Sequence, residues 1–471
     1  MPFILPANTL SAGGYDVANS LRVNENDSPR LHKTNGTPTS RRKFTFSCWV
    51  KRASLDAASD LHMLFNFNGN SNRFYVAFFG DQLRVNATKS GDGTTAMDIK
   101  TNRLFRDFSA WYSIVVAVDT EQGTAANRVK IFINGVQETS FATETYPSED
   151  DDIHVNESDV ELLEFKNNAA HFFDGYITEI VYIDGSQEAV TSFGEFDEDS
   201  GIFKPIDVSG LNFGNNGFYL DFEDSSNLGN DANGGTDFTE VNIVAVDQST
   251  DTCTNNSATF NPLFTPNPSN VSTFSEGNLK VVTNSTSQNS EGLSTLGLTT
   301  GKWYGEFKLI AQAAGESLCG VLNNIENVTS SGLNGTGGFS VASNGDSFNN
   351  GSSQGAGNFS ASYTTNDIIG IALDLDNNRV YFSKNGSYTD GSGNFDESSP
   401  TGYFSLTSGQ TYFMGVGDKS TSQSSTWEAN FGSPSFAISS SNTDANDYGN
   451  FEYAVPSGYY ALNTKNLAEF G

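Results

Sequence analysis

The chain is predicted to be an all-β protein of two tandem antiparallel β-sandwich (jelly-roll) domains, and three features of the sequence support this fold class. Short stretches that alternate apolar and polar residues recur along the 471 residues, as in FTFSCWV at 44–50. Turn-forming pairs such as Asn134-Gly135 and Asp184-Gly185 separate these stretches. No clear helical stretch lies between them, which argues against alternating strands and helices.

The length and the composition predict the domain organisation. A chain of 471 residues is too long for one ordinary core. Segment 247–272 is rich in Asn, Ser, Thr and Pro and poor in apolar alternation, so we interpret it as an extended linker. The predicted first sandwich is then 1–246 and the second is 273–438. The remaining segment, 439–471, is aromatic and is expected to dock onto a core.

Alternation and enrichment in β-branched or aromatic residues predict the strands in each half. In 44–50, Phe44, Phe46, Cys48 and Val50 share one face of the strand. The other clear strands of the first half are 73–79, 83–87, 111–119, 129–134 and 176–183. Those of the second half are 279–282, 302–310, 368–375, 379–383, 411–417 and 426–431.

One hairpin pattern occurs in both halves. Segment 114–119 ends in Asp and is followed by a strand that ends in Asn134-Gly135, and 369–374 is followed in the same way by a strand ending in Asn385-Gly386. An Asn-Gly pair suits a type I′ turn between antiparallel strands. The repetition predicts two sandwiches of related architecture.

The charge and the cysteines limit the function and the compartment. The chain has 56 acidic and 25 basic residues, a formal net charge of −31, which disfavours binding to nucleic acid or to an anionic membrane. Cys48, Cys253 and Cys319 are odd in number and far apart, so folding in a reducing cytoplasm is expected. The start MPFILPANTL does not read as a signal peptide, and no apolar run reaches transmembrane length.

Several segments of the first half resemble a known domain in order. They are 15–22 (YDVANSLR), 44–52 (FTFSCWVKR), 102–120, 127–137 and 172–185. This series is similar to the core strands of a concanavalin A-like, laminin-G-type domain. The second half resembles a SPRY (B30.2-like) domain in 301–309 (GKWYGEFKL), 367–386 and 427–432 (WEANFG). Both resemblances imply concanavalin-like sandwiches, and SPRY domains are protein-interaction modules in animals.

A further resemblance concerns the setting of the protein. Segments 213–239, 251–263 and 451–471 are similar to sequence segments found in predicted structural proteins of tailed bacteriophages. The resemblance implies a virion protein, made in the host cytoplasm, that serves as a tail fibre, a receptor-binding component or a capsid decoration. Its partners would be other virion proteins and, in host attachment, the polysaccharide of the host surface. Whether the chain forms homo-oligomers is left open.

The search for catalytic residues gives two near-matches. Laminarinase-type hydrolases with this fold alternate Glu-x-Asp-x-(x)-Glu along a strand. Glu195-Phe-Asp197-Glu-Asp199 lacks the last Glu and is interpreted as an acidic turn. Ser353 stands in a Gly-x-Ser-x-Gly pattern without a strand before it or a helix after it. The histidines have no metal spacing and are expected to be surface or core residues: His32, His62, His154 and His171. We therefore expect no enzyme.

Calcium is the one cofactor for which candidate residues exist. Glu149, Asp150, Asp151 and Asp152 form a dense acidic run, and Ca²⁺ takes several oxygen ligands from such loops. Segment 374–378 has similar residues but also matches a strand and hairpin. Consecutive carboxylates usually point apart and stay hydrated, so we predict no cofactor and keep Ca²⁺ as the alternative.

The aromatic residues suggest which rings pack and which bind. All four tryptophans fall in strand patterns and are expected in or near the cores: Trp49, Trp111, Trp303 and Trp427. Tyr459 and Tyr460 lie in the tail and are the freer rings for stacking on a sugar.

Three functions stay open from the sequence. The first is a non-enzymatic virion protein that displays lectin-like domains for host glycans or neighbouring subunits. The second is a polysaccharide depolymerase acting on host envelope glycans, and the third is a purely architectural capsid or tail protein. The N-terminal segment 1–12 and the aromatic tail are the candidates for docking onto the particle.

Overall fold

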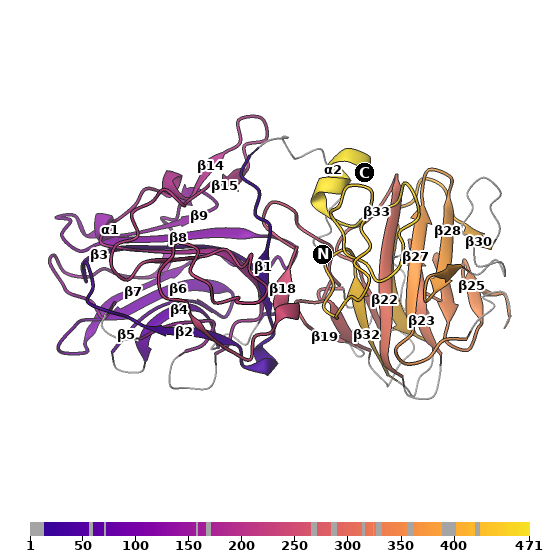
Figure 1. Cartoon of the computed structure of the whole chain (residues 1–471), viewed down its shortest axis with the longest axis horizontal. Coiled ribbons are helices and arrows are strands. Elements are labelled where there is room, and N and C mark those ends of the chain that lie inside the picture. The colour runs from indigo at the N-terminus through magenta and orange to yellow at the C-terminus, as the bar shows by residue number, and fades with distance from the viewer. Residues whose placement is uncertain are drawn as a thin grey trace. The chain divides into compact units, whose positions relative to one another are not determined.

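Figure 1 shows the computed structural model of the chain. It describes the residues 14–55, 60–69, 72–156, 159–165, 171–264, 271–283, 290–312, 316–323, 325, 332–355, 362–388, 402–419 and 424–471. Those up to Thr254 belong to one compact unit, and those from Asn255 onward belong to a second unit. The all-β fold of antiparallel sandwiches is confirmed.

The first unit is a sandwich of two eight-stranded sheets, which appear as two layers in Figure 1. In the first sheet the order is β10 (Val136–Gln137), β9 (Val129–Ile133), β8 (Tyr112–Asp119), β3 (Lys43–Arg52), β13 (Gly175–Asp184), β1 (Ser20–Val23) and β18 (Gln248–Ser249), with β16 (Phe218–Leu220) on β13. In the second it is β11 (Phe141–Thr145), β7 (Thr95–Thr101), β6 (Gln82–Thr88), β5 (Asn72–Phe79), β4 (Leu61–Gly69), β12 (Asp159–Leu162), β2 (Arg30–Thr34) and β17 (Thr239–Val241). A separate hairpin consists of β14 (Gly194–Phe196) and β15 (Phe203–Pro205).

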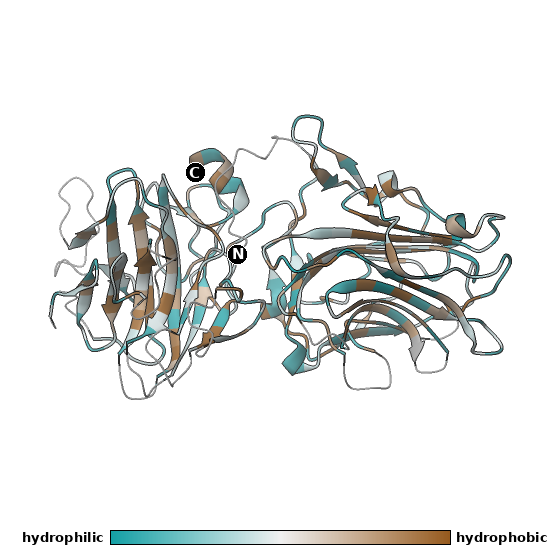
Figure 2. Ribbon diagram, turned by 180° about the vertical axis from the view of Figure 1, so that it is seen from behind, coloured by the Kyte–Doolittle hydropathy of each residue, from teal (hydrophilic) through white to brown (hydrophobic). Residues whose placement is uncertain are grey.

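The core of the first unit lies between the two sheets, where the apolar residues of facing strands meet (Figure 2). The residues Phe44, Phe46, Cys48 and Val50 of β3 all lie in it with no exposed surface, as the alternation predicts. Trp49 points to the opposite face of the sheet and packs into a second, smaller cluster. Both faces of β3 are therefore covered by protein.

The second unit is also a sandwich. Its nine-stranded sheet has the order β19 (Thr273–Ser275), β20 (Lys280–Val282), β32 (Ser425–Asn430), β22 (Lys302–Gln312), β27 (Ile368–Asp374), β28 (Arg379–Lys384) and β29 (Ser387–Tyr388), with β30 (Tyr403–Ser405) on β28 and β33 (Tyr460–Ala461) on β22. Its six-stranded sheet has the order β21 (Glu291–Leu293), β31 (Phe413–Asp418), β23 (Ser317–Leu322), β24 (Gly338–Ala342), β25 (Ser347–Asn349) and β26 (Ser352–Ser353). The pairing of β33 with β22 is parallel, and the other pairings in these two sheets are antiparallel.

Helices are short in both units. They are α1 (Ala125–Arg128), α2 (Thr464–Phe470) and the 3-10 turns η1 (Glu25–Asp27), η2 (Val190–Ser192) and η3 (Ala245–Asp247). Within the part of the chain that the structure describes, no helix has the length and apolar character needed to cross a membrane.

The repeated hairpin is confirmed. In the first unit β8 pairs with β9, and in the second β27 pairs with β28. The turn residues have positive φ angles of 49° at Asn134, 78° at Gly135, 49° at Asn385 and 76° at Gly386. Two successive residues with positive φ define the type I′ turn, which Asn and Gly adopt most easily.

The predicted linker is wrong over most of its length. Gln248 and Ser249 form β18, which pairs with β1, and Asp251 is 1% exposed. On the other side of the unit boundary, Phe260 is fully buried in the second core. The composition suggests a solvated segment, but its polar groups bond to the sandwiches: Thr254 Oγ1, for example, accepts a hydrogen bond from Val17 N. Pro266 and Pro268 lie outside the described residues.

The aromatic tail packs against the second sandwich, as expected, and belongs to it. Phe451 and Tyr459 have no exposed surface, and β33 continues the sheet beside β22. The prediction that Tyr459 and Tyr460 are free for a sugar is wrong. Tyr459 is buried, and the ring of Tyr460 is stacked 3.8 Å from that of Phe470.

Candidate functional site

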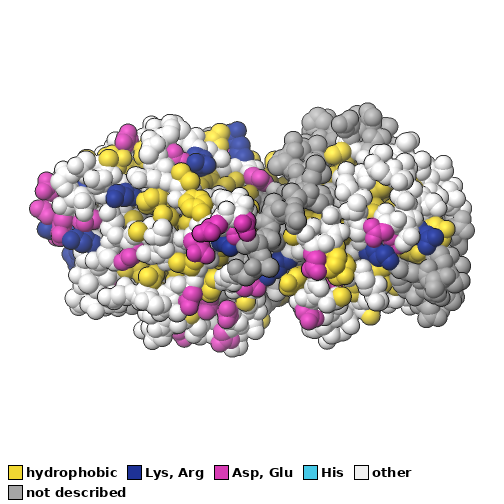
Figure 3. Space-filling view, turned by 90° about the horizontal axis from the view of Figure 1, so that it is seen from above, with side chains coloured by type: hydrophobic (Ala, Val, Ile, Leu, Met, Phe, Trp, Pro, Cys, Tyr) yellow, Lys and Arg dark blue, Asp and Glu magenta, His cyan; other side chains and the backbone are white. Residues whose placement is uncertain are grey.

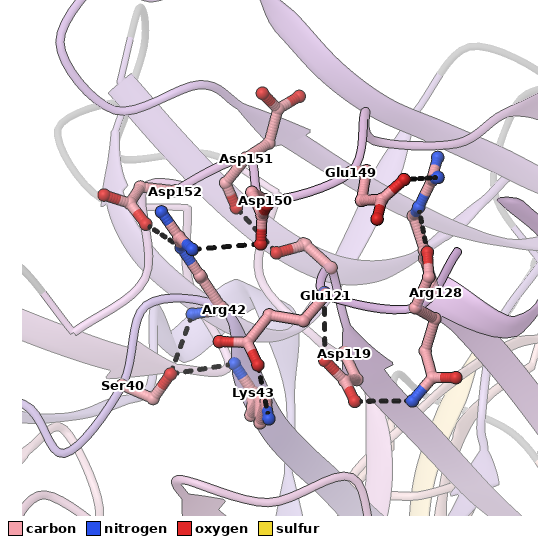
Figure 4. Close-up of polar contacts among 12 residues, drawn as sticks. Ser40, Arg42, Lys43, Asp119, Glu121, Arg128, Glu149, Asp150, Asp151 and Asp152 are labelled. Carbon is pink, nitrogen blue, oxygen red and sulfur yellow. Dashed lines mark hydrogen bonds and ion pairs between the residues drawn. The ribbon is translucent and has the colours of Figure 1, made fainter. Parts of the chain in front are cut away.

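The acidic run at 149–152 is held by basic side chains (Figure 4). Arg42 lies 3.1 Å from Asp150 and 2.7 Å from Asp152, and Lys89 lies 2.5 Å from Asp151. Hydrogen bonding to Asp152 raises the pKa of Arg42. Glu149 lies 3.7 Å from Arg128. Figure 3 likewise shows acidic and basic side chains next to each other at the left end of the first unit.

These contacts do not favour calcium binding at Asp150, Asp151 and Asp152, because each carboxylate already has a cationic partner. Asp150 and Asp152 both bind the guanidinium group of Arg42, and Asp151 binds the ammonium group of Lys89. Among the described residues, no group of three or more His, Cys, Asp or Glu side chains is arranged to hold a metal ion. The second candidate, 374–378, is a hairpin turn in which Asp374 Oδ1 accepts a hydrogen bond from Asn377 N.

Two of the four histidines lie closer together than their spacing suggests. His62 is 2% exposed, and burial lowers its pKa to about 3, with the charges of Arg52 and His171 acting in the same direction. The His171 Nδ1 atom lies 3.2 Å from Asp60. His62 therefore stays neutral at physiological pH and, as expected, is a core residue. His154 is buried too, at 3% exposure.

Neither catalytic near-match forms a catalytic arrangement. The residues from Glu195 to Asp199 lie in the β14–β15 hairpin, where Asp197 Oδ1 accepts hydrogen bonds from the Ser200 backbone and Asp197 Oδ2 pairs with Lys204 at 2.7 Å. Asp197 thus stabilises a turn. Ser353 Oγ donates to the carboxylate of Asp346, at 3.1 and 3.0 Å, so its hydroxyl has an acid as its partner and not a histidine.

A polar pocket of about 460 Å³ opens at the end of β2 in the first unit. It is lined by three segments that are far apart in the sequence: 33–37, 215–217 and 235–236. The side chains of these segments are amides, hydroxyls and one ammonium group, and three of the residues are glycines. The pocket has room for a monosaccharide or a small part of a glycan chain.

The rim of the pocket is fixed by a buried carboxylate at the end of β13. Asp184 is 2% exposed and accepts hydrogen bonds from the backbone N–H groups of Thr39, Ser40 and Asn216, at 2.7, 3.1 and 3.2 Å. A carboxylate that accepts several backbone N–H bonds ties those segments together more strongly than a neutral acceptor does. Two loops 180 residues apart are held in register by this one side chain.

A second contact joins the same two loops directly. Asn216 Oδ1 accepts from Gly36 N at 2.9 Å, and Asn216 Nδ2 donates to Gly36 O at 3.1 Å. Asn216 is 6% exposed, and its side-chain amide pairs with both the N–H and the C=O of Gly36, as the backbone of a neighbouring strand would. The walls of the pocket are therefore formed before any ligand arrives, which lowers the entropic cost of binding.

Asn35 is the polar lining residue with unused hydrogen-bonding capacity. Its Nδ2 and Oδ1 atoms are buried, and neither has a hydrogen-bond partner within the described residues. Leaving such groups unpaired costs about 1–3 kcal/mol each.

Lys33 supplies the only charged group among the lining residues. It is 8% exposed, and its Nζ atom lies 4.8 and 4.9 Å from the ring centres of Phe218 and Phe238. The carboxylate of Asp231, which is 2% exposed, lies 3.6 Å away. Burial lowers the pKa of Lys33 and raises that of Asp231.

Sequence reasoning did not find this pocket. Its residues are Asn, Thr and Gly, which the composition assigns to ordinary turns, and they come together only through β2, β16 and β17. One available signal was the run of amides and glycines at 213–217, which directly precedes the aromatic strand Phe218–Leu220.

Comparison with known proteins finds a family match for part of the first unit. Residues 25–186 match the family model of the concanavalin A-like lectin/glucanases superfamily. The matched region includes β2 and Lys33, whereas segments 215–217 and 235–236 of the pocket follow it in the sequence. No curated protein matches the sequence of the chain.

Several solved structures are similar to the chain. The SPRY domain of human HERC1 has 18% identity and a TM-score of 0.27 over 36% of this chain and 96% of that one. A putative carbohydrate binding protein from Bacteroides ovatus has 12% identity and a TM-score of 0.35 over 48% of this chain and 58% of that one. A heptameric SAP-like pentraxin from Limulus polyphemus has 12% identity and a TM-score of 0.27 over 37% and 80%. Neither the family match nor these structures point to a bacteriophage.

Proposed function

We propose that the chain is a non-enzymatic carbohydrate-binding protein and that the pocket at 33–37, 215–217 and 235–236 takes the sugar. The observation that carries this proposal is a preformed polar pocket, one wall of which, at 33–37, lies in the region that matches the concanavalin A-like lectin/glucanases superfamily. The name of that superfamily covers lectins and glucanases, which both handle saccharides. Amide and hydroxyl side chains suit a saccharide because its hydroxyl groups both donate and accept hydrogen bonds.

The amide of Asn35 supports the proposal further. Its two unpartnered atoms destabilise the free protein and would be satisfied by a sugar hydroxyl that accepts from Nδ2 and donates to Oδ1. Such a cost in the free state is typical of binding residues, where stability and function oppose each other. Removing the amide is therefore expected to weaken binding without weakening the fold.

The proposal is tested with the whole purified chain on an array of bacterial and plant polysaccharides, followed by calorimetric titration of the best ligand. Asn35→Ala is expected to lower the affinity roughly tenfold, the equivalent of about 1.4 kcal/mol, and to leave the melting temperature unchanged or higher. Asn102→Ala is the matched control, because Asn102 is an exposed amide that does not line the pocket. Equal affinity of the Asn35→Ala variant and the unchanged protein would contradict the assignment of the pocket.

The absence of catalysis is part of the proposal. Its support is the structural use of Asp197 in a turn and of Ser353 in a bond to Asp346. Incubation of the chain with the polysaccharide that it binds is expected to release no new reducing ends. Their appearance would favour the depolymerase alternative.

We also propose that the protein acts on the particle of a tailed bacteriophage, in attachment to host glycans or to neighbouring subunits. The support is the resemblance of 213–239 and 451–471 to phage structural proteins. Antibody labelling of particles, viewed by electron microscopy, tests this setting. Unlabelled particles in a preparation whose infected cells make the protein would contradict it.

A further inference from the structure

The lining residue Lys33 forms a close ion pair with Asp231, and its polar contacts are long. Lys33 Nζ lies 3.6 Å from the Asp231 carboxylate and donates a hydrogen bond of 3.5 Å to Thr236 O. Both distances are long for an N–H donor, whose bonds to oxygen are usually 2.7–3.2 Å. Lys33 therefore keeps donor capacity for an oxygen atom in the pocket.

The position of the Asp231 carboxylate is fixed by the backbone around it. Its Oδ1 atom accepts from Tyr219 N at 3.0 Å and from Asn233 N at 3.1 Å. A Cβ atom on Gly235 would lie only 2.3 Å from Oδ2, so the glycine makes room for this oxygen. Asp231 N in turn donates to Asp237 Oδ1 at 3.0 Å. Asp231 cannot move away when a ligand approaches Lys33.

The charge balance of the pocket opposes an anionic ligand. The positive charge of Lys33 is matched by Asp231, and Asp237 adds a second carboxylate that acts on Lys33. The remaining lining residues are Thr34, Asn35, Gly36, Thr37, Asn215, Asn216, Gly217, Gly235 and Thr236, none of which is charged. The whole chain carries a formal net charge of −31, which repels anions as they approach.

From this arrangement we infer that the pocket selects neutral sugars over uronic or other acidic sugars, and that Asp231 is the residue that sets this selectivity. This inference rests on the proposed function of the pocket. A neutral hydroxyl oxygen accepts from Lys33 without disturbing the ion pair, and Asn35 serves the neighbouring hydroxyl. A sugar carboxylate would have to compete with Asp231 for Lys33 while lying next to a buried like charge, which is unfavourable.

The test compares the affinities of a neutral glucan and a polyuronate of similar chain length for the full chain. The unchanged protein is expected to bind the neutral polymer at least tenfold more tightly, with little dependence on salt. Asp231→Asn keeps the Oδ1 acceptor and the shape but removes the carboxylate that pairs with Lys33, so that only the more distant Asp237 still acts on its charge. We expect this variant to bind the polyuronate at least tenfold more tightly than the unchanged protein does, with an affinity that falls as salt is added.

Two further variants make the result specific. Glu198→Gln changes the net charge by the same amount at an exposed residue of the β14–β15 hairpin and is expected to leave both affinities unchanged. The double variant Lys33→Met with Asp231→Asn is expected to lose the gain for the polyuronate, because the ammonium group of Lys33 is gone. A gain that persists in the double variant would overturn the role of this pair.

The failure of the inference differs from the failure of the proposed function. Tighter binding of the polyuronate by the unchanged protein would overturn the inference while carbohydrate binding stands. Binding of neither polymer, nor of any glycan on the array, would overturn the proposed function itself. If the Asp231→Asn variant does not fold, as judged by its melting curve, the two polymers compared on the unchanged protein still test the selectivity, and Lys33→Met, expected to leave the preference for the neutral polymer in place, tests the role of the pair.

Discussion

The Nζ atom of Lys51 lies 2.7 Å from the carboxylate of Asp251, 200 residues further along the chain, and each side chain is 1% exposed. Trp111 Nε1 also donates to Asp251 Oδ1, at 3.1 Å. A buried charge pair of this kind ties the end of the first unit to the centre of its sheet, and losing one partner leaves the other charge buried and uncompensated.

Removal of Asp251 is therefore expected to be strongly destabilising. Asp251→Ala should lower the free energy of unfolding of the first unit by about 3–5 kcal/mol, as for other buried pairs that lose one member. Glu121→Ala is the control, because Glu121 pairs with Lys43 at the surface and such pairs contribute about 0–1 kcal/mol. Urea denaturation followed by tryptophan fluorescence measures both changes. A loss below 1 kcal/mol for Asp251→Ala would show that the segment after residue 247 is not anchored in this way.

The stability of the protein is expected to fall as the pH rises from about 5 to 8. Burial is the largest cause that raises the pKa of three glutamates, to about 8 for Glu179 and about 7 for Glu291 and Glu306. Each folded-state pKa lies above the ordinary value of 4.5, so the folded state binds more protons within this window. Melting temperatures measured between pH 5 and pH 8 should decrease steadily. An increase over this range would contradict the burial of these acids.

Glu291 separates this effect from the general charge of the protein. One of its oxygens accepts from Leu333 N at 2.8 Å, and the other is buried without a hydrogen-bond partner among the described residues. Glu291→Gln removes the titration and is expected to make the pH dependence of the melting temperature shallower. Glu198→Gln, at an exposed residue, should leave the slope as it is.

The two Asn-Gly hairpins are expected to respond alike to substitution. Asn134 Oδ1 accepts from Ser113 N at 2.8 Å, and Asn385 Oδ1 accepts from Ile368 N at 2.9 Å. Alanine at either position loses this bond and must adopt a positive φ, at a combined cost of about 2 kcal/mol. Glycine loses the bond alone and should cost about half as much. Peptide-resolved hydrogen exchange assigns each loss to its own unit, and equal losses for alanine and glycine would argue against a contribution from φ.

Phe451 is expected to be as important to the second sandwich as a residue of its strands. Its ring packs edge-on against Tyr304 of β22, with the centres 5.0 Å apart, and has no exposed surface. Phe451→Ala should cost about 3–5 kcal/mol, whereas Glu469→Ala, at an exposed position of α2, should cost less than about 0.5 kcal/mol. Thermal unfolding of the two variants measures this difference. A small effect at Phe451 would mean that the tail contributes little to the fold.

The strands, the core faces and the repeated hairpin could be predicted from the sequence because each depends on neighbouring residues. The alternation alone places Phe46 and Cys48 on the buried face of their strand, independently of distant residues. In the same way, Asn134-Gly135 favours its turn locally. The linker prediction failed for the opposite reason. Composition does not distinguish a solvated polar residue from one that, like Asp251, bonds to a distant partner.

The candidate sites depended on distant partners as well. The carboxylates of Asp150 and Asp152 could be read as cation ligands, but their partner Arg42 comes more than a hundred residues earlier. The pocket combines 33–37 with 215–217 through Asp184 and Asn216, and no local pattern marks that combination. Contacts of this range become visible only in the folded structure.

The pocket lies partly outside the superfamily match, which ends at residue 186, because two of its three segments lie at 215–217 and 235–236. The sandwich core and the loops of the proposed binding pocket can therefore accumulate mutations independently. If the pocket binds as proposed, substitutions at Asn215, Gly235 or Thr236 alter what it recognises and leave the sheets intact. A protein whose target surface changes over generations could follow that change through a few exposed loop residues, at little risk to its folding.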